Sequence, residues 1–265
     1  MPETKNNHYI PQFYISQWKF NDKQVYCLQK ENSKIFKTNS RNIFADRIWD
    51  NEVENMFAQI ENKFWIPIIN TILKDKTMDK LSKTELECFL SFAIALKSRK
   101  KYHVVEYDKA VKSSFAKFDN ELIRDGKAPK KEIEKLQKYD KKIFNYIFLS
   151  AFTPDNLFKK GSTFNQFKRL SYDIRIIQEN DMQYGQFLTS NCPLLMLNEK
   201  DKVYLIMIAL TPNLLVFGTK GIETFKAVHN KPINIIIKKF NQGIYNDPNS
   251  EYIISNKKSL LEQFL

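Results

Sequence analysis

A short run near the amino terminus concentrates the side chains best suited to chemistry. His8, Tyr9, Gln12 and Tyr14 flank Pro11 in the run His-Tyr-Ile-Pro-Gln-Phe-Tyr. An imidazole gains and loses a proton near neutral pH, and the neighbouring phenol and amide groups can hydrogen-bond a polar substrate. We therefore take His8 as a catalytic candidate and Tyr9, Gln12 and Tyr14 as binding candidates. The alternative is that His8 bonds to the backbone and fastens an amino-terminal strand to a sheet.

A basic run after an apolar segment supplies a second candidate group. Lys97 and Arg99 precede two further lysines at positions 100 and 101. A guanidinium group binds phosphate in a bidentate manner, and ammonium groups add positive charge. We predict Arg99 as a catalytic residue and Lys97 as a binding residue for an anionic substrate. Ordinary basic surface is the alternative.

Two carboxylates could hold a metal ion. Glu54 and Glu61 are separated by two helical turns and so share one helix face. Carboxylate oxygens are the preferred ligands of magnesium and suit manganese as well, and Asp46 is a possible third ligand. The sequence therefore offers a magnesium or manganese site at Glu54 and Glu61. An exposed helix surface explains the same pattern.

Other enzyme signatures are absent or misplaced. The run Glu61-Asn62-Lys63 carries the letters of a restriction-type nuclease element, but it falls inside an expected helix instead of a strand. No Gly-x-Ser-x-Gly sequence exists, and the glycines at 218 and 221 lack the Lys-Ser/Thr pair of a phosphate loop. These features argue against a serine hydrolase and against a P-loop nucleotide hydrolase.

Hydrophobic periodicity predicts the first elements that must hold these residues. Two β-prone runs, 24–28 and 34–37, predict a hairpin near the amino terminus. From Asn51 onward, apolar residues recur at helical spacing, which predicts a helix that Pro67 bends. The run Ser-Lys-Thr-Glu from Ser82 has the form of a capping box and predicts the start of a second helix, with a pattern that continues toward Phe118.

The rest of the chain returns to short strands. A further helix is expected over 130–150, and Pro232 opens another that runs through Phe240. The expected strands are 172–178, 185–189, 194–197, 203–210, 213–218 and 251–254. This order predicts an α+β fold with an N-terminal β-hairpin, a central helical bundle and a C-terminal antiparallel sheet with a flanking helix.

Length and composition favour one domain. The chain has 265 residues, of which 43% are hydrophobic, and it contains only six glycines. No flexible linker divides it, so we expect a single compact domain over 1–265. Its parts are a β-rich beginning (1–50), a helical region (51–167) and a sheet region (168–265).

The charge favours an anionic partner. Lys and Arg number 42 against 30 Asp and Glu, which gives a net charge of +12. Such a charge can attract nucleic acid or a nucleotide, and a solvated lysine surface, the more common source of such a charge, is the alternative. Three cysteines without CxxC spacing indicate a reducing compartment, and no apolar run is long enough for a membrane span. We therefore expect a cytoplasmic protein without a membrane partner, with self-association or a partner protein left open.

Several motifs occur in an order that resembles one bacterial family. They are 7–14, the acidic helix around 53–61, the segment from Phe92 to Arg99, the run Thr189-Ser190-Asn191 before a proline, and the turn at 210–212. Together they resemble the family known as domain of unknown function 4238. The resemblance implies a site at Thr189, Ser190 and Asn191, where the family's usual aspartate is replaced by Asn191.

This resemblance leads to two functional hypotheses. The first is a nucleic-acid- or nucleotide-processing effector in phage defence or a toxin system, acting as a metal-assisted nuclease or phosphodiesterase with His8, Arg99 and Asn191 as catalytic residues. The second is a non-catalytic nucleic-acid-binding or regulatory module that retains the family pocket, because an amide cannot serve as a base. Thr189 and Ser190 are binding candidates under either hypothesis.

Overall fold

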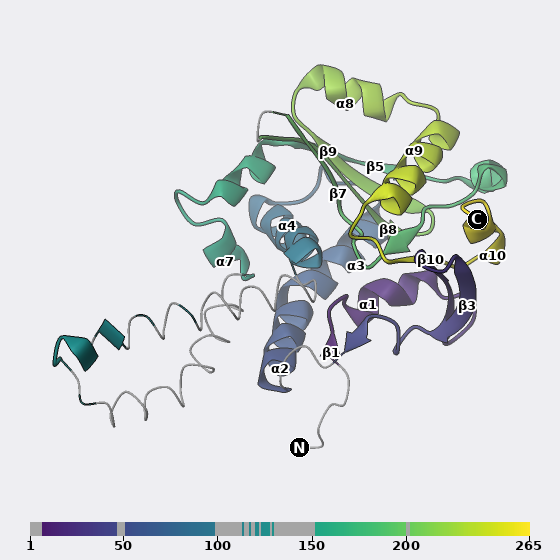
Figure 1. Cartoon of the computed structure of the whole chain (residues 1–265). Helices are drawn as coiled ribbons and strands as arrows, with labels where there is room; N and C mark the ends of the chain where they lie inside the picture. The colour runs from purple at the N-terminus through teal and green to yellow at the C-terminus, as the bar shows by residue number, and fades with distance from the viewer. Residues whose placement is uncertain are drawn as a thin grey trace.

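The computed structural model describes residues 7–46, 51–98, 152–199 and 202–265, together with isolated positions between 113 and 129. Arg99, the expected helix over 130–150 and most of the expected helical continuation between 104 and 118 lie outside the described residues. Within them, helices accompany antiparallel sheets, which confirms the predicted α+β class. The arrangement is shown in Figure 1.

The amino-terminal part is a mixture of strand and short helix. Its elements are β1 (Asn7–His8), α1 (Gln12–Ile15), the 3-10 helix η1 (Ser16–Trp18), β2 (Gln24–Gln29), β3 (Lys34–Asn39) and β4 (Ala45–Asp46). The predicted hairpin is present as β2 and β3, which pair in antiparallel fashion. The run 12–18, which falls within the β-rich beginning expected over 1–50, is helical and follows Pro11, whose φ of −54° suits the residue before a helix.

The central helices follow the predicted pattern. They are α2 (Asn51–Ile60), the π-helical turn η2 (Glu61–Trp65), α3 (Ile66–Asp75) and α4 (Lys83–Ser98). Pro67 lies in the first turn of α3, directly after the π-helical turn. Proline has no amide hydrogen to donate, and a missing donor is tolerated best in the first turn of a helix. The capping box is formed, since the Ser82 hydroxyl accepts from the Glu85 amide at 3.3 Å and Glu85 accepts from the Ser82 amide at 2.8 Å.

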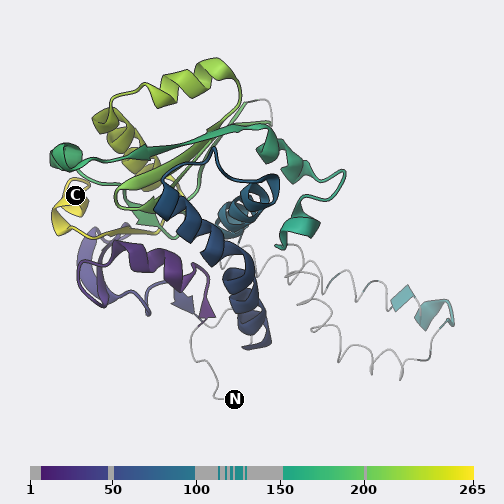
Figure 2. The ribbon, with the colours of Figure 1, turned by 180° about the vertical axis from the view of Figure 1, so that it is seen from behind.

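The larger carboxyl-terminal sheet has the strand order β5-β9-β8-β7 and is antiparallel throughout. Its strands are β5 (Ser171–Ile176), β7 (Leu195–Glu199), β8 (Lys202–Thr211) and β9 (Leu214–Thr219). The helices α8 (Ile222–His229) and α9 (Ile233–Asn246) pack on one side, and α4 lies on the other. Both Figure 1 and Figure 2 show the sheet between α8 and α4. Residues 89–96 of α4 are all buried.

A second four-stranded sheet joins the two ends of the chain. Its order is β3-β2-β10-β6, where β6 is Thr189–Ser190 and β10 is Tyr252–Ser255. The strand β10, which is the last described strand in sequence, therefore lies between β2 of the first hairpin and β6. Short helices complete the described part: α7 (Pro154–Leu157), η3 (Thr163–Arg169), η4 (Glu179–Tyr184) and α10 (Lys258–Glu262).

Three details differ from the sequence-based expectations. The expected strand over 185–189 is wrong, because only Thr189 and Ser190 form a strand. The preceding backbone is held by other partners: the Leu188 amide donates to Asn241 Oδ1 at 2.9 Å and the Phe187 amide to the Pro212 carbonyl at 2.8 Å. The helix after Pro232 continues to Asn246, past the expected end at Phe240, and the helices α8 and α10 were not predicted. Among the residues described, no helix is long and apolar enough to cross a membrane.

Candidate functional site

Tyr14 connects the opening motif to the strand β6. Its hydroxyl lies 2.8 Å from Thr189 Oγ1 and donates to the Ala209 carbonyl at 2.9 Å. The ring packs against Trp18 and Phe92, and Trp18 Nε1 donates to the Phe187 carbonyl. Burial raises the pKa of Tyr14 far above its ordinary value, so the phenol stays protonated well into the alkaline range. Two motifs 175 positions apart in the chain are therefore in direct contact.

The other residues of the opening motif bond to the amino-terminal part. His8 pairs with Ala45 in β4, and its Nε2 lies 2.7 Å from the Arg41 carbonyl oxygen. Gln12 donates to the hydroxyls of Ser16 and Ser40. These contacts agree with the alternative that His8 fastens a strand.

Tyr9 belongs to an aromatic row. Its amide donates to the Phe44 carbonyl at 3.1 Å, and its ring centroid lies 5.5 Å from that of Phe44, which in turn lies 6.3 Å from Tyr252. Phe44 has a φ of 61°, a left-handed conformation that bulky residues seldom adopt. The row of aromatic rings links the opening motif to the strand β10.

Asn191 forms hydrogen bonds to the backbone of residues 249–252 with every polar group of its side chain. Its Oδ1 accepts from the amides of Glu251 and Tyr252 at 2.9 and 3.0 Å, and its Nδ2 donates to the Asn249 carbonyl at 3.0 Å. Only 7% of Asn191 is exposed. Two of the three bonds require an acceptor, which an aspartate would also supply. The arrangement therefore explains how either residue type can occupy this position.

Ser190 and Cys192 add contacts on the same side. Ser190 Oγ lies 2.9 Å from Ser250 Oγ and accepts from the Cys192 amide at 2.9 Å. The Cys192 thiol donates to Asp247 Oδ2 at 3.2 Å. Thr189, Ser190 and Cys192 are all buried. The run 189–192 therefore fixes the loop 247–252, which forms one end of a cavity.

The predicted metal site does not gain further ligands within the described part of the chain. Glu54 is in α2 and Glu61 begins the π-helical turn. No group of three His, Cys, Asp or Glu side chains close enough to hold a metal occurs among the described residues. The side chain of Asp46 and the whole of Arg99 fall outside that part.

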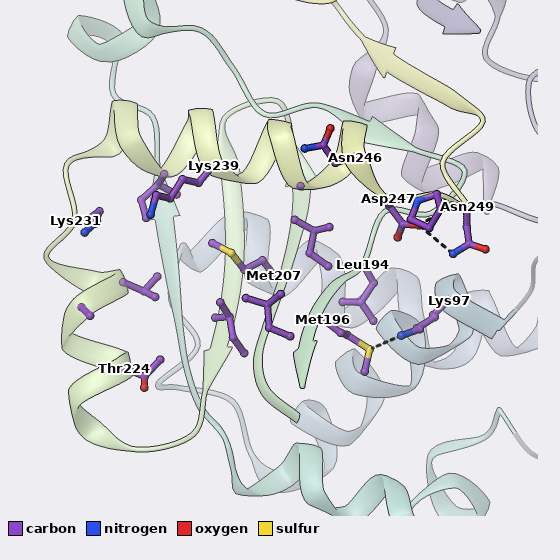
Figure 3. A pocket seen from close by; sticks show the side chains of 18 residues that line it. Lys97, Leu194, Met196, Met207, Thr224, Lys231, Lys239, Asn246, Asp247 and Asn249 are labelled. Atoms are coloured by element: carbon purple, nitrogen blue, oxygen red, sulfur yellow. Dashed lines mark hydrogen bonds between the residues drawn. The ribbon is translucent and has the colours of Figure 1, made fainter. Parts of the chain in front are cut away.

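A cavity of about 650 Å³ lies between the large sheet, α8 and α9 (Figure 3). Half of the residues that line it are aliphatic or thioether: Leu194, Leu195, Met196, Leu197, Leu205, Met207, Ala227, Val228 and Ile236. This volume is within the range of about 300–1,000 Å³ that small-molecule pockets usually have. Of the residues singled out in the sequence, Lys97 lines this cavity. The periodicity of the sequence did not indicate that the other lining residues would form a cavity.

The polar groups of the cavity gather at its two ends. Lys231 and Lys239 lie together near the connection between α8 and α9, whereas Lys97, Asp247 and Asn249 lie at the opposite end (Figure 3). Lys97 Nζ is 3.2 Å from Met196 Sδ. Asp247 Oδ1 accepts from the Asn249 amide and side chain at 2.8 and 3.0 Å. One end is thus doubly cationic, and the other combines a cation with a carboxylate.

Residues of β5 fix the helix that forms one wall. Arg175 donates to the carbonyl oxygens of Val228 and His229 in the last turn of α8 and to that of Lys231 just after it. Asp173 Oδ2 lies 2.5 Å from His229 Nδ1. A cation that satisfies terminal carbonyl groups stabilises the end of a helix. The position of Lys231 at the cavity therefore depends on β5.

Among the comparisons with known proteins, a match to a family model is the informative one. Neither the curated proteins nor the solved structures contain a match. The model of the family described as "Protein of unknown function (DUF4238)" matches residues 6–259, which include the opening motif, the run 189–192 and the whole lining of the cavity. The chain therefore belongs to the DUF4238 family.

Proposed function

We propose that this protein is a non-catalytic, ligand-binding regulatory module that takes up a small molecule with an apolar body and a negatively charged group. The observation that carries the proposal is the cavity of about 650 Å³, which is lined by aliphatic side chains and bordered by lysines. Apolar lining supplies most of the binding free energy of such sites, and a few polar groups orient the ligand.

The charges at the cavity support an anionic ligand. No ion pair joins Lys231 or Lys239 to a carboxylate among the described residues, although both side chains line the cavity. An ammonium group without a partner attracts an anion, and the net charge of +12 acts in the same direction. The buried residues of the run 189–192 support a binding role, because their groups hold the loop at the end of the cavity.

A fluorescent aromatic sulfonate, 1-anilinonaphthalene-8-sulfonate, tests this function. We expect saturable binding of one probe per folded chain, and a loss of about fivefold in affinity for each of Lys231→Gln and Lys239→Gln. Lys238→Gln is the matched control, because Lys238 is exposed on the same helix but does not line the cavity. Equal affinity in all three variants would contradict the proposed site.

A space-filling variant provides an independent check. Ala227 lines the cavity from α8 and is exposed, so Ala227→Phe narrows the cavity without burying a new group in the core. We expect it to weaken probe binding and leave the thermal unfolding midpoint nearly unchanged. The control is Ala58→Phe, at an exposed helical alanine in α2 that does not line the cavity. Probe binding by Ala227→Phe with wild-type affinity would place the probe elsewhere.

Nucleic-acid or nucleotide processing, in phage defence or a toxin system, is our second candidate. The net charge of +12 favours it, because lysines bind phosphates regardless of sequence. Labelled RNA and DNA are incubated with the protein with and without magnesium or manganese. Cleavage that is lost in His8→Ala supports this candidate, and intact nucleic acid under all conditions contradicts it.

A further inference from the structure

The lining of the cavity carries information about the shape of its ligand. Among the described residues that line it, none is aromatic. Proteins commonly hold a nucleobase by stacking it on aromatic rings and by hydrogen bonds to its edges. Here the middle of the cavity offers aliphatic and thioether side chains, and the hydroxyl and amide groups of Thr224, Asn246 and Asn249 lie toward its ends (Figure 3). This composition suits a flexible aliphatic chain better than a base.

The two ends differ in charge, which gives the ligand a direction. Lys231 and Lys239 place two cations at one end. At the other end the charge of Lys97 is offset by Asp247, whose carboxylate is occupied by Asn249 and the Cys192 thiol. An anionic head group is therefore attracted to the end with Lys231 and Lys239, and the remainder of the ligand extends over the sheet toward Leu194.

Two methionines fit a site that accepts chains of more than one conformation. Met196 lies on β7 and Met207 on β8, and both side chains line the cavity. Methionine is unbranched and polarizable, so it adapts to an irregular apolar partner. Gly243 lets α9 pack closely on Leu195 of the floor, because a Cβ atom there would lie only 2.6 Å from Leu195 Cδ1.

We propose that the ligand of this cavity is a free aliphatic carboxylate, bound with its head group at Lys231 and Lys239 and its chain along the floor formed by β7 and β8. This proposal rests on the proposed function, because it names the ligand class of the same site. The two lysines then bind the charged head group, and the floor contributes affinity in proportion to the apolar area that the chain buries.

Competition with the bound sulfonate measures both roles. Octanoate, decanoate and dodecanoate are titrated below their micelle-forming concentrations. Because each buried methylene contributes about 0.8 kcal/mol, affinity is expected to rise about fourfold per methylene. Dodecylammonium, with the opposite charge, is expected to bind more weakly than dodecanoate by tenfold or more. Adenosine monophosphate is expected to give no competition.

The lysine variants separate the head group from the chain. Lys231→Gln and Lys239→Gln are expected to weaken dodecanoate about fivefold each and to leave the neutral dodecanol unchanged. Lys238→Gln should alter neither. If the sulfonate binds at the cavity but affinity is independent of chain length, or adenosine monophosphate competes better, the ligand class is wrong while the binding function stands. If the sulfonate does not bind at the cavity, both proposals fail.

Discussion

Asn191 illustrates how a conspicuous polar residue can serve the backbone. Its amide makes three hydrogen bonds to residues 249–252, and it is almost fully buried. We expect Asn191→Ala to lower the free energy of unfolding by about 1–3 kcal/mol, because the amides of Glu251 and Tyr252 then lack an acceptor in a partly buried place. Urea unfolding at pH 7 measures the difference.

The aspartate variant is the informative comparison. Asn191→Asp keeps the acceptor for both amides and loses only the bond to the Asn249 carbonyl. We therefore expect it to be less destabilising than Asn191→Ala, and to gain no catalytic activity. Equal losses in both variants would show that the two backbone amides contribute nothing. A gained nuclease activity would instead support a disabled catalytic site.

At the residue scale the sequence identified the motifs but not their partners. His8, Tyr14 and Thr189 stand out by type and order, yet the contact between Tyr14 and Thr189 spans 175 positions and follows from the packing of α1 on α4. Lys97 was selected for its basic neighbours, whereas its nitrogen lies beside Met196. Such pairings depend on tertiary structure, which a single sequence does not encode in local spacing.

At the scale of elements, Arg175 links a strand to a cavity wall. Its guanidinium donates to three carbonyl groups at the end of α8 and just after it, a task that requires several donors in one plane. We expect Arg175→Lys to raise amide hydrogen exchange across residues 222–229 about tenfold, because lysine cannot serve all three carbonyls at once. The exchange of β9 serves as the internal reference, and equal exchange in variant and wild type would contradict a capping role.

Local signals predicted some elements and missed others for physical reasons. The capping box at Ser82 and the hairpin at 24–39 depend on neighbours in sequence, so they were predicted correctly. The run 185–189 has strand-like composition, but Asn241 of α9 bonds to the Leu188 amide and the Gln186 carbonyl in place of a neighbouring strand. The helix α8 is short and has no buried residue, which weakens its apolar pattern.

At the scale of the whole molecule, buried phenols and a buried thiol make the free energy of unfolding vary with pH in the alkaline range. Burial raises the pKa of Cys27 from 9.0 to about 12 and raises those of Tyr14 and Tyr172 well above their ordinary values. The folded state keeps these protons where the unfolded state releases them. The free energy of unfolding is therefore expected to fall as pH rises above about 9.

Urea unfolding between pH 7 and 11 checks this expectation. Tyr14→Phe is expected to cost about 1–3 kcal/mol at pH 7, because Thr189 and Ala209 lose a partner, and to flatten the decline above pH 10. Tyr184→Phe is the control, since 51% of Tyr184 is exposed. Constant stability across this pH range would contradict the role of the buried groups.

The cavity could not be predicted from the sequence, because its lining comes from segments far apart in the chain. Lys97 comes from α4, and most of the other lining residues come from β7, β8, α8, α9 and the loop after α9. Individually these residues look like ordinary core or ordinary surface. The apolar runs of β7 and β8 did predict a sheet, but which face α8 and α9 leave open is a property of their packing.

The position of β10 bears on how the protein is made. This strand lies between β2 and β6, so the hairpin completed by residue 39 keeps one edge unpaired until residues 252–255 leave the ribosome. Nascent chains expose such edges to aggregation, and residues 40–251 must be synthesised before β10 can cover this one. The amino-terminal sheet can therefore close only after β10 has left the ribosome, and a chain interrupted before residue 252 keeps an exposed strand edge that chaperones can bind.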